Sequence, residues 1–501
     1  GCFAKTARRE ARRADVVVVN HALLLSDPGL RGTLLAESGA LIVDEAHHLE
    51  RVAREQRGVS LGVSDLARLL ARTDAKTGAL RLLSRSLRRG RSETAQATIT
   101  ESDHALRAVV ACAADVARDL ESLLPPGVTS ALWPRGVDLA RVSPHAVDRC
   151  LTAIGEAVYR LGRAADAAEA DDGAALRPGD AARDALDEVR GQHARWIEVD
   201  QAFRAVLRLE DRDVATYVDR DERGSARLNR RPLEVGTVLR DSIFSLSSST
   251  LLTSATLSSS PGDDLSDGAS ALGLPADQVE SLRLPSPFPL ERQVLTLVLD
   301  GLEPNDPAYP RSLAAAVAEL AKTIRRNTLV LLTSYQMLEA VEAHLAPALE
   351  AEGIPLFAQT PGEAAGPLAR AFREGSGAVL LGTASFWEGV DFPGEALEVL
   401  VIARLPFSVP TEPVIAARSE RIVEEGGDPF RDLMLPEAVL RFRQGVGRLI
   451  RSATDRGAVL VADPRIVRST YGRRFQAALP SAPRPVADER ESVDLLLRWF
   501  A

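Results

Sequence analysis

The stretch Ala40-Leu-Ile-Val-Asp-Glu-Ala-His-His48 decides the fold class. A short apolar run, rich in branched side chains, ends on two adjacent carboxylates, Asp44 and Glu45. Buried parallel strands have this composition, and open α/β sheets bind their ligands at the carboxyl ends of such strands. The stretch therefore predicts a parallel strand that delivers two acids to a ligand site.

Two neighbouring acids with different tasks suit nucleotide hydrolysis. One carboxylate can hold Mg²⁺ through its water shell, while the other orients the attacking water. We assign Asp44 to the metal and Glu45 to the water. The alternative is a strand that runs into a solvated acidic turn, and a four-residue match is decided only by its context.

Composition places the chain among globular proteins. Its 501 residues are enough for two to four domains, and its apolar content of 45% is ordinary. We find no signal peptide, no apolar run long enough to cross a bilayer, and too few cysteines (three) for a disulfide framework, so we expect a cytoplasmic protein. The net charge of −9 argues only weakly against nucleic acid as a partner. The first residue is Gly1 rather than methionine, so we also expect further protein upstream.

In the first half of the chain, the pattern of apolar residues changes near residue 60. Before it we expect a basic helix over 2–14 and strands over 15–20 and 40–43. After it, helical periodicity runs to about residue 210, in long amphipathic helices around 106–124, 144–161 and 180–206. Cys112 and Cys150 fall in these helices, where we expect them to be small core residues.

The second half alternates strands and helices. We expect a strand over 247–252 that runs into a small-residue turn, then strands at 328–333, 354–358, 378–382, 397–403 and 457–462, with helices that include 363–373 and 436–450. Short apolar strands with helical crossovers predict a second parallel sheet covered on both faces. The fold class is α/β. We place the boundaries at 1–57, 58–210 (the helical insertion), 211–284 and 285–501.

Two further stretches carry chemistry. In Gln444-Gly-Val-Gly-Arg-Leu-Ile-Arg451 we expect Arg448 and Arg451 to share a helical face, with Gln444 one turn earlier, as donors for a terminal phosphate. The alternative is a solvated basic face, but glycines in a helix usually mark the close approach of another group.

The other stretch is Ala378-Val-Leu-Leu-Gly-Thr-Ala-Ser-Phe-Trp-Glu-Gly-Val-Asp-Phe-Pro-Gly394, a buried strand that opens into a loop of the kind that holds ligands. Its Trp387 either stacks on a base or fills the core, and the sequence leaves both open.

These motifs occur in one order along the chain: Val43-Asp-Glu-Ala-His47, Thr253-Ser-Ala-Thr-Leu257, Leu329-Val-Leu-Leu-Thr-Ser-Tyr335, Gly382-Thr-Ala-Ser-Phe-Trp-Glu-Gly-Val-Asp391 and Gln444-Gly-Val-Gly-Arg-Leu-Ile-Arg451. The ordered set resembles a superfamily 2 helicase, and more narrowly the DinG branch of the DinG/XPD iron–sulfur DNA helicases. The resemblance covers 2–48 and 232–501. It implies two RecA-like lobes of doubly wound parallel sheet, with the helical insertion as an arch domain in the first lobe.

The resemblance implies an ATP-dependent DNA helicase that translocates 5′ to 3′ on single-stranded or forked DNA during repair or replication. It implies that Asp44 binds Mg²⁺ and that Glu45 orients the attacking water. It also implies that Arg448 and Arg451 contact the γ-phosphate. Four more residues would line the nucleotide: Gln444, Gly389, Asp391 and His47.

The same resemblance implies how hydrolysis meets DNA. Ser254 and Thr256 would couple hydrolysis to movement of the lobes. Ser334, Tyr335 and Thr383 would contact the DNA backbone.

Cys2 resembles the fourth ligand of the family's [4Fe–4S] cluster, because a basic helix and an Asn-His-Ala-Leu-Leu run follow it. A cluster usually needs four cysteines, so this chain alone should not hold one, although we expect the cluster in the intact protein. A phosphate-binding loop with glycines before a Lys-Ser/Thr pair is also missing, because all three lysines occur as Ala-Lys-Thr. The chain alone is therefore expected to be inactive.

Two alternatives remain open. A non-catalytic DNA-binding or scaffold protein could retain the helicase fold, although the intact acids and arginines speak against that. The second alternative is a DinG-type protein with a fused nuclease domain. Cys2 argues against it, because a cluster ligand would then have no purpose.

Overall fold

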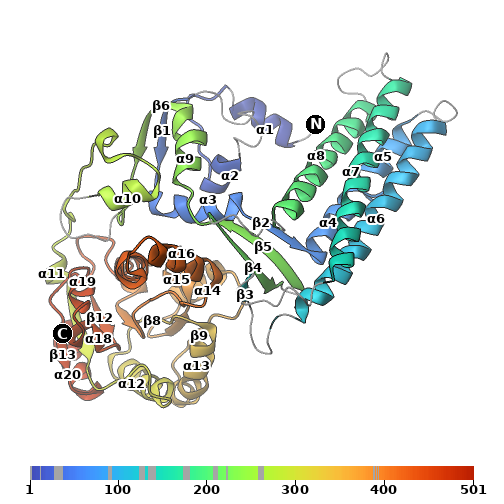
Figure 1. Ribbon diagram of the computed structural model, residues 1–501. Coiled ribbons are helices and arrows are strands. Elements are labelled where there is room, and N and C mark those ends of the chain that lie inside the picture. Colours follow the sequence, from blue (N-terminus) through green and yellow to red (C-terminus); the bar gives the residue numbers. More distant parts are fainter. Residues whose placement is uncertain are drawn as a thin grey trace. The chain divides into compact units, whose positions relative to one another are not determined.

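A seven-stranded parallel sheet organises the second half of the chain (Figure 1). The computed structural model describes residues 3–11, 13–26, 38–87, 93–122, 124, 130–133, 143–172, 181–206, 213–221, 224–257, 265–387, 390, 392 and 394–501. The chain forms two units. The first unit comprises Gly1–Gly39, His48–Ser248 and Val409–Glu425, and the second comprises Ala40–His47, Ser249–Ser408 and Gly426–Ala501.

The strands of the second unit follow the order β13-β7-β12-β11-β8-β10-β9, and each neighbouring pair is parallel. The five strands that we predicted here are confirmed. The pattern missed β7 and β13, which extend the sheet at one edge. The strands are β7 (Val294–Leu299), β8 (Thr328–Leu331), β9 (Leu356–Ala358), β10 (Val379–Gly382), β11 (Val399–Ile402), β12 (Gly457–Val461) and β13 (Arg484–Val486).

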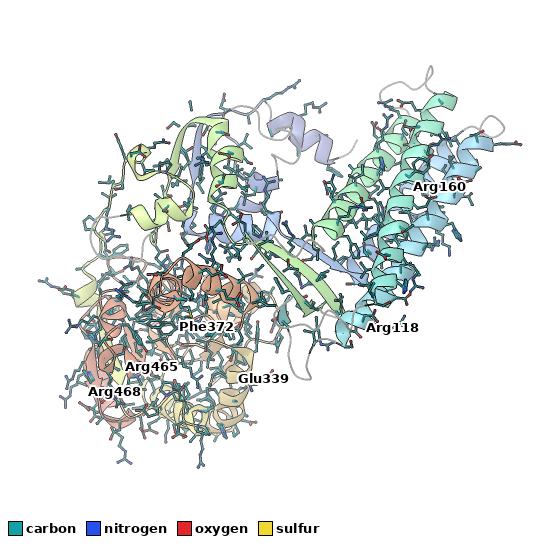
Figure 2. All side chains as sticks on the ribbon, viewed as in Figure 1. Arg118, Arg160, Glu339, Phe372, Arg465 and Arg468 are labelled. Atoms are coloured by element: carbon teal, nitrogen blue, oxygen red, sulfur yellow. The ribbon has the colours of Figure 1, made fainter. Side chains whose placement is uncertain are left out.

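Helices cover both faces of this sheet, which explains why its central strands are continuously apolar. In β8, Leu329 and Leu331 belong to one core, and Val330 belongs to the other. Figure 2 labels Phe372, which lies in the first of these cores and packs edge-on against Phe392. The first core is covered by α14 (Ala365–Glu374), α15 (Ala384–Trp387), α17 (Leu435–Val446), α18 (Arg465–Arg468) and α19 (Gly472–Gln476), and the second by α12 (Tyr309–Ile324), α13 (Tyr335–Glu350) and α20 (Glu489–Phe500).

The first unit contains the predicted helical insertion. Three long helices lie side by side in Figure 1, and their contacts agree: α6 (Glu93–Glu121), α7 (Pro144–Asp172) and α8 (Ala181–Val206). Cys150 is fully buried between them and Cys112 packs beside this core, as predicted. Figure 2 labels Arg160 on α7, which forms ion pairs with Glu101 of α6 and with Glu156 of its own helix.

A four-stranded antiparallel sheet, which the sequence did not predict, joins this bundle. Its order is β2-β5-β4-β3, and it consists of β2 (Val59–Gly62), β3 (Ser130–Trp133), β4 (Val214–Arg220) and β5 (Ala226–Pro232). Helical periodicity on either side hid the short β3. Other helices of this unit are α1 (Phe3–Ala11), α2 (His21–Ser26), α3 (Leu49–Arg57), α4 (Val63–Thr73), α5 (Ala79–Ser86) and α9 (Gly236–Ser242).

The predicted strand over 15–20 is wrong. This segment has no assigned secondary structure and pairs with no strand among the described residues, and Val16 and Val18 are 79% and 91% exposed. A β-rich composition gives a strand only where a partner supplies the ladder of hydrogen bonds.

Helix α16 (Pro413–Glu424) belongs to the first unit although sequence on both sides of it belongs to the second. It packs on β3 and β4, with Ile415 buried. Arg418 lies 3.6 Å from Glu50, and Arg421 donates to Asp213 at 2.9 Å. Our predicted boundaries placed this helix with residues 285–501, so the two units do not follow those boundaries.

The described helices include none that combines the length and apolar character needed to span a bilayer. Other short elements of the second unit include α10 (Ser266–Ala271), α11 (Leu290–Gln293) and a π-helix over Phe430–Met434.

Candidate nucleotide site

The two acids lie where strands β1 (Ser38–Val43) and β6 (Ser247–Leu252) end together. Thr253 N–H donates to the Val43 carbonyl at 2.9 Å, and Ala46 N–H donates to the Thr253 carbonyl at 3.0 Å. The Oδ1 of Asp44 accepts hydrogen bonds from the Thr253 hydroxyl at 2.9 Å and from Glu45 N–H at 3.0 Å. The strand therefore delivers both acids to a carboxyl edge, as predicted, and Thr253 fixes the first of them. The expectation that this strand is buried is wrong, because Ile42 is 69% exposed and β1 pairs only with β6 among the described strands.

Glu45 has a left-handed backbone, with φ of 49°. An L-residue with a side chain pays an energetic cost for this conformation, which is commonly retained at functional sites because the surrounding structure holds it. Here the bonds of Thr253 to both sides of the turn hold it. The side chain of Glu45 is 56% exposed, so its carboxylate faces solvent.

A chain of hydrogen bonds connects this acidic turn to helix α17. His47 Nδ1 lies 2.7 Å from the Ser254 hydroxyl and 3.3 Å from Oε2 of Glu45. Ser254 Oγ also accepts from Thr256 N–H at 3.0 Å, and the Gln444 amide donates to the buried Thr256 hydroxyl at 3.2 Å. Three motifs that are far apart in sequence therefore meet in one unit.

Gln444 lies near the end of α17, where Gly445 allows a close packing contact. A Cβ on Gly445 would lie 2.6 Å from the ring of Trp387. Trp387 is 2% exposed, and its indole N–H donates to the Leu332 carbonyl at 3.2 Å. The ring thus fills the core, which decides between the two interpretations of Trp387, and the glycine signal was read correctly at this position. The Oε1 atom of Gln444 is buried and accepts no hydrogen bond from the described part of the chain.

The expectation that Arg448 and Arg451 share a helical face is wrong. Helix α17 ends at Val446, followed by a turn, because Arg448 N–H bonds back only three residues to Gly445. Arg448 donates to the carbonyls of Trp387 at 3.3 Å and Val390 at 2.7 Å. Arg451 is exposed beyond the turn, and its backbone N–H donates to Asp455.

The charges around this turn are set by hydrogen bonds and burial. Burial alone would raise the pKa of Asp455, but hydrogen bonds from Ser452 and from the backbone of Arg451 outweigh it and lower that pKa. Burial, and then the positive charge of Arg283, lower the pKa of Arg443, which adjoins Gln444 in sequence. The positive charges of Arg443 and Arg283 therefore lie close enough to repel each other.

The predicted DNA contacts lie at the ends of neighbouring strands of the large sheet. Ser334 is exposed and caps α13, accepting from Met337 N–H at 3.2 Å, and Tyr335 next to it is partly buried. Thr383 is 3% exposed, and its N–H and hydroxyl both donate to the side-chain Oε1 of Gln359, at 3.0 and 2.9 Å. The sequence reasoning missed Gln359 and Thr253, because a polar residue after a short strand is too common a signal on its own.

Three predicted site residues, Cys2, Gly389 and Asp391, lie outside the described residues. The other two cysteines lie on α6 and α7, inside or beside the bundle core. A [4Fe–4S] cluster usually takes four thiolates, so the cysteines of this chain do not fit one by themselves. Within the described residues, no group of three or more His, Cys, Asp or Glu side chains is arranged to hold a metal, whereas Mg²⁺ in nucleotide sites needs only one or two carboxylates and water.

Comparisons with known proteins identify the family of the chain. Residues 317–482 match the family described as the helicase C-terminal domain. The chain is 33% identical over 496 residues to the ATP-dependent DNA helicase YoaA of Escherichia coli, a match that spans 96% of this chain and 69% of that protein. The chain belongs to the DinG/YoaA helicase family.

Another member of the DinG/YoaA family is the protein of Bacillus subtilis named 3′-5′ exonuclease DinG. It is 32% identical over 505 residues, and the chain spans 96% of its own length but only 53% of that relative. The fold also matches a solved structure titled XPD helicase, with a TM-score of 0.56 and 15% identity, over 96% of this chain and 74% of that one. The predicted fold class, α/β with two RecA-like lobes, is thereby confirmed.

Proposed function

We propose that this chain is the motor part of a DinG-type ATP-dependent DNA helicase that translocates 5′ to 3′ on single-stranded or forked DNA, acting in repair or replication in the cytoplasm. Family membership supports ATP and DNA as ligands. The observation that carries the proposal is the hydrogen-bonded series His47, Ser254, Thr256 and Gln444, which joins an acidic turn to a helix end rich in arginine.

The acids and arginines at the two ends of this series would each have a task in hydrolysis. Asp44, with Oδ1 fixed by Thr253, would bind the water shell of Mg²⁺, which supplies charge neutralisation when bound. Glu45 would orient the attacking water, and His47 would hold the Glu45 carboxylate in place. Arg448 and Arg451 would stabilise the charge that develops on the γ-phosphate.

Ser254 and Thr256 would pass the state of the nucleotide to α17. The contact from Gln444 to Thr256 is a single hydrogen bond to a neutral hydroxyl, which is weak enough to be exchanged during each cycle. Gly389 and Asp391 would complete the nucleotide side, and Ser334 and Tyr335 would lie toward the DNA.

The 501 residues contain no glycine-rich loop followed by Lys-Ser/Thr, so we propose that the chain alone does not turn over ATP. The test compares the chain with a fusion to the part of the E. coli relative that lies outside the matched 69%. We expect the fusion to hydrolyse ATP only with single-stranded DNA present. Changing Glu45→Gln in the fusion should lower this rate by about 10²–10⁴-fold, the usual effect of losing a positioned base.

The missing loop also favours a second candidate, a DNA-binding scaffold. A fusion that binds DNA but has no ATPase activity above that of its Glu45→Gln variant would support the scaffold and contradict the motor. Conversely, ATP hydrolysis by the unfused chain would contradict the proposed need for a loop from outside these residues.

We further propose a [4Fe–4S] cluster in the complete enzyme, with Cys2 as one ligand. Cys112 and Cys150 are in a helical core and would not take part. Changing Cys2→Ser in a fusion that contains the missing cysteines should remove the absorbance of the cluster, whereas changing Cys112→Ser should leave that absorbance unchanged.

A further inference from the structure

Three neighbouring strands of the large sheet end in polar residues. Strands β8, β10 and β9 are adjacent in that order, and they are followed by Ser334, Thr383 and Gln359. Both pairings, β8 with β10 and β10 with β9, are parallel, so these residues lie at one carboxyl edge, with the strands about 5 Å apart. The hydroxyls at this edge differ in what they can still donate.

The hydroxyl of Thr383 is committed to the protein. Its O–H donates to Gln359 Oε1 at 2.9 Å, and the residue is 3% exposed. A phosphate oxygen is only an acceptor, so a contact needs a donor that is both accessible and uncommitted. Thr383 offers neither.

The hydroxyl of Ser385, two residues later, is in the opposite situation. Ser385 is exposed, and its oxygen accepts a hydrogen bond from Gln359 Nε2 at 2.8 Å. In the described part of the chain, Ser385 Oγ has no second hydrogen-bond partner. Its oxygen is therefore held by the protein, and its proton remains available to an external acceptor.

Gln359 produces this difference through its two amide ends. The carbonyl end accepts both donors of Thr383, which fixes the amide orientation and turns the NH₂ end toward Ser385. Gln359 is 3% exposed, so the amide has little freedom to reorient. Ser334 repeats the pattern on β8, because its oxygen accepts from Met337 N–H and the residue is exposed.

We infer that Ser385, oriented by Gln359, donates the hydrogen bond to a DNA backbone phosphate at this edge, together with Ser334, and that Thr383 does not. Gln359 is then a positioning residue. Gly382 permits the arrangement, because a Cβ there would lie 2.6 Å from Phe386 and would prevent the strand from turning into α15. The inference rests on the proposed function, and it replaces Thr383 as the contact that the family resemblance implied.

The test measures binding of the 501-residue chain to a fluorescent oligo-dT by anisotropy over a range of salt concentrations. Ser385→Ala should weaken binding by about two- to tenfold, the usual effect of one lost hydrogen bond, and Ser385→Thr should restore it. Thr383→Val, which removes the buried hydroxyl at nearly constant shape, should change the affinity by less than Ser385→Ala does.

A gain of charge separates contact from a structural role. Ser385→Lys should tighten binding and steepen the dependence of log K on log salt by about 0.7, the value for one added phosphate contact on a single strand. Gln359→Glu should weaken binding, because a carboxylate can only accept and would take the Ser385 proton. That effect should be smaller when Ser385 is already alanine.

The outcomes are distinct. An unchanged salt dependence in Ser385→Lys, or a larger loss in Thr383→Val than in Ser385→Ala, overturns the assignment to Ser385 while the proposed function stands. If the chain binds no oligo-dT at all, the proposed DNA-binding function fails, and the inference fails with it.

Discussion

Changing Gly445→Ala tests whether the end of α17 is packed as described. The added Cβ would lie 2.6 Å from the Trp387 ring, where ordinary contacts are at least 3.4 Å, so about 0.8 Å of room is missing. Trp387 cannot easily yield, because its indole N–H bonds to Leu332 and its carbonyl accepts from Arg448. Overpacking of this kind costs about 1–3 kcal/mol, partly offset by about 1 kcal/mol from the better helix propensity of alanine.

Gly447, two residues later, provides the matched control. A Cβ there would meet only the carbonyl oxygens of Arg443 and Gln444, at 3.3 and 3.5 Å, and its φ is an ordinary −63°. Changing Gly447→Ala should therefore be neutral or stabilising by up to about 1 kcal/mol. The two changes should differ by about 2 kcal/mol, which is close to 30-fold in the unfolding equilibrium.

The assay is equilibrium unfolding in urea, followed by tryptophan fluorescence, with the midpoint shift converted at a common slope. The expected order of free energy of unfolding is Gly447→Ala, wild type, then Gly445→Ala. Equal stabilities for the two alanine variants would refute the packing of Trp387 against α17, and with it the role of Gly445 in placing Gln444.

Three further predictions concern the acidic turn, the loop after α17 and the bundle. Glu45→Gly should be more stable than Glu45→Ala by about 1 kcal/mol, the reverse of an ordinary position, because φ at 45 is left-handed; equal unfolding midpoints would argue against that conformation. The pKa of Asp455 is lowered, so its contribution is present at neutral pH and is lost as the pH falls through that lowered value; Asp455→Asn should therefore be less stable than wild type at pH 7, with the gap closing below about pH 4 in unfolding curves taken across pH. Burial raises the pKa of Cys150 to about 12, so iodoacetamide at pH 8 should label Cys112 first and Cys150 only on unfolding, as peptide mass spectrometry would show.

The sequence predicts most of the second unit because its signals are local. Runs such as Thr328–Leu331 and Val399–Ile402 are short and almost entirely apolar, which fits a strand buried on both faces. The prediction of a strand over 15–20 was wrong because a strand also needs a partner strand, and the sequence of one segment does not show whether a partner is present. The predicted end of α17 was also wrong. The helical periodicity of apolar residues continues through Leu449 and Ile450, although the helix ends at Val446.

The candidate site was predictable in its residue types and less so in its connections. The motifs located Asp44, Glu45 and Gln444, because paired acids after an apolar run and donors beside glycines are rare combinations. No local pattern could show that Gln444 meets Thr256, or that Gln359 separates the roles of Thr383 and Ser385. Those relations depend on which strands become neighbours, and that is decided by crossovers across the whole sheet.

Helix α16 limits how this protein can be divided for study. A chain started at residue 285 would contain every strand of the seven-stranded sheet but would carry α16 without β3 and β4, on which it packs. Ile415 would then face water, and Arg418 and Arg421 would lose Glu50 and Asp213. Such a fragment should be prone to aggregation. Replacing residues 409–425 with a short glycine-rich linker would be the better way to isolate that half.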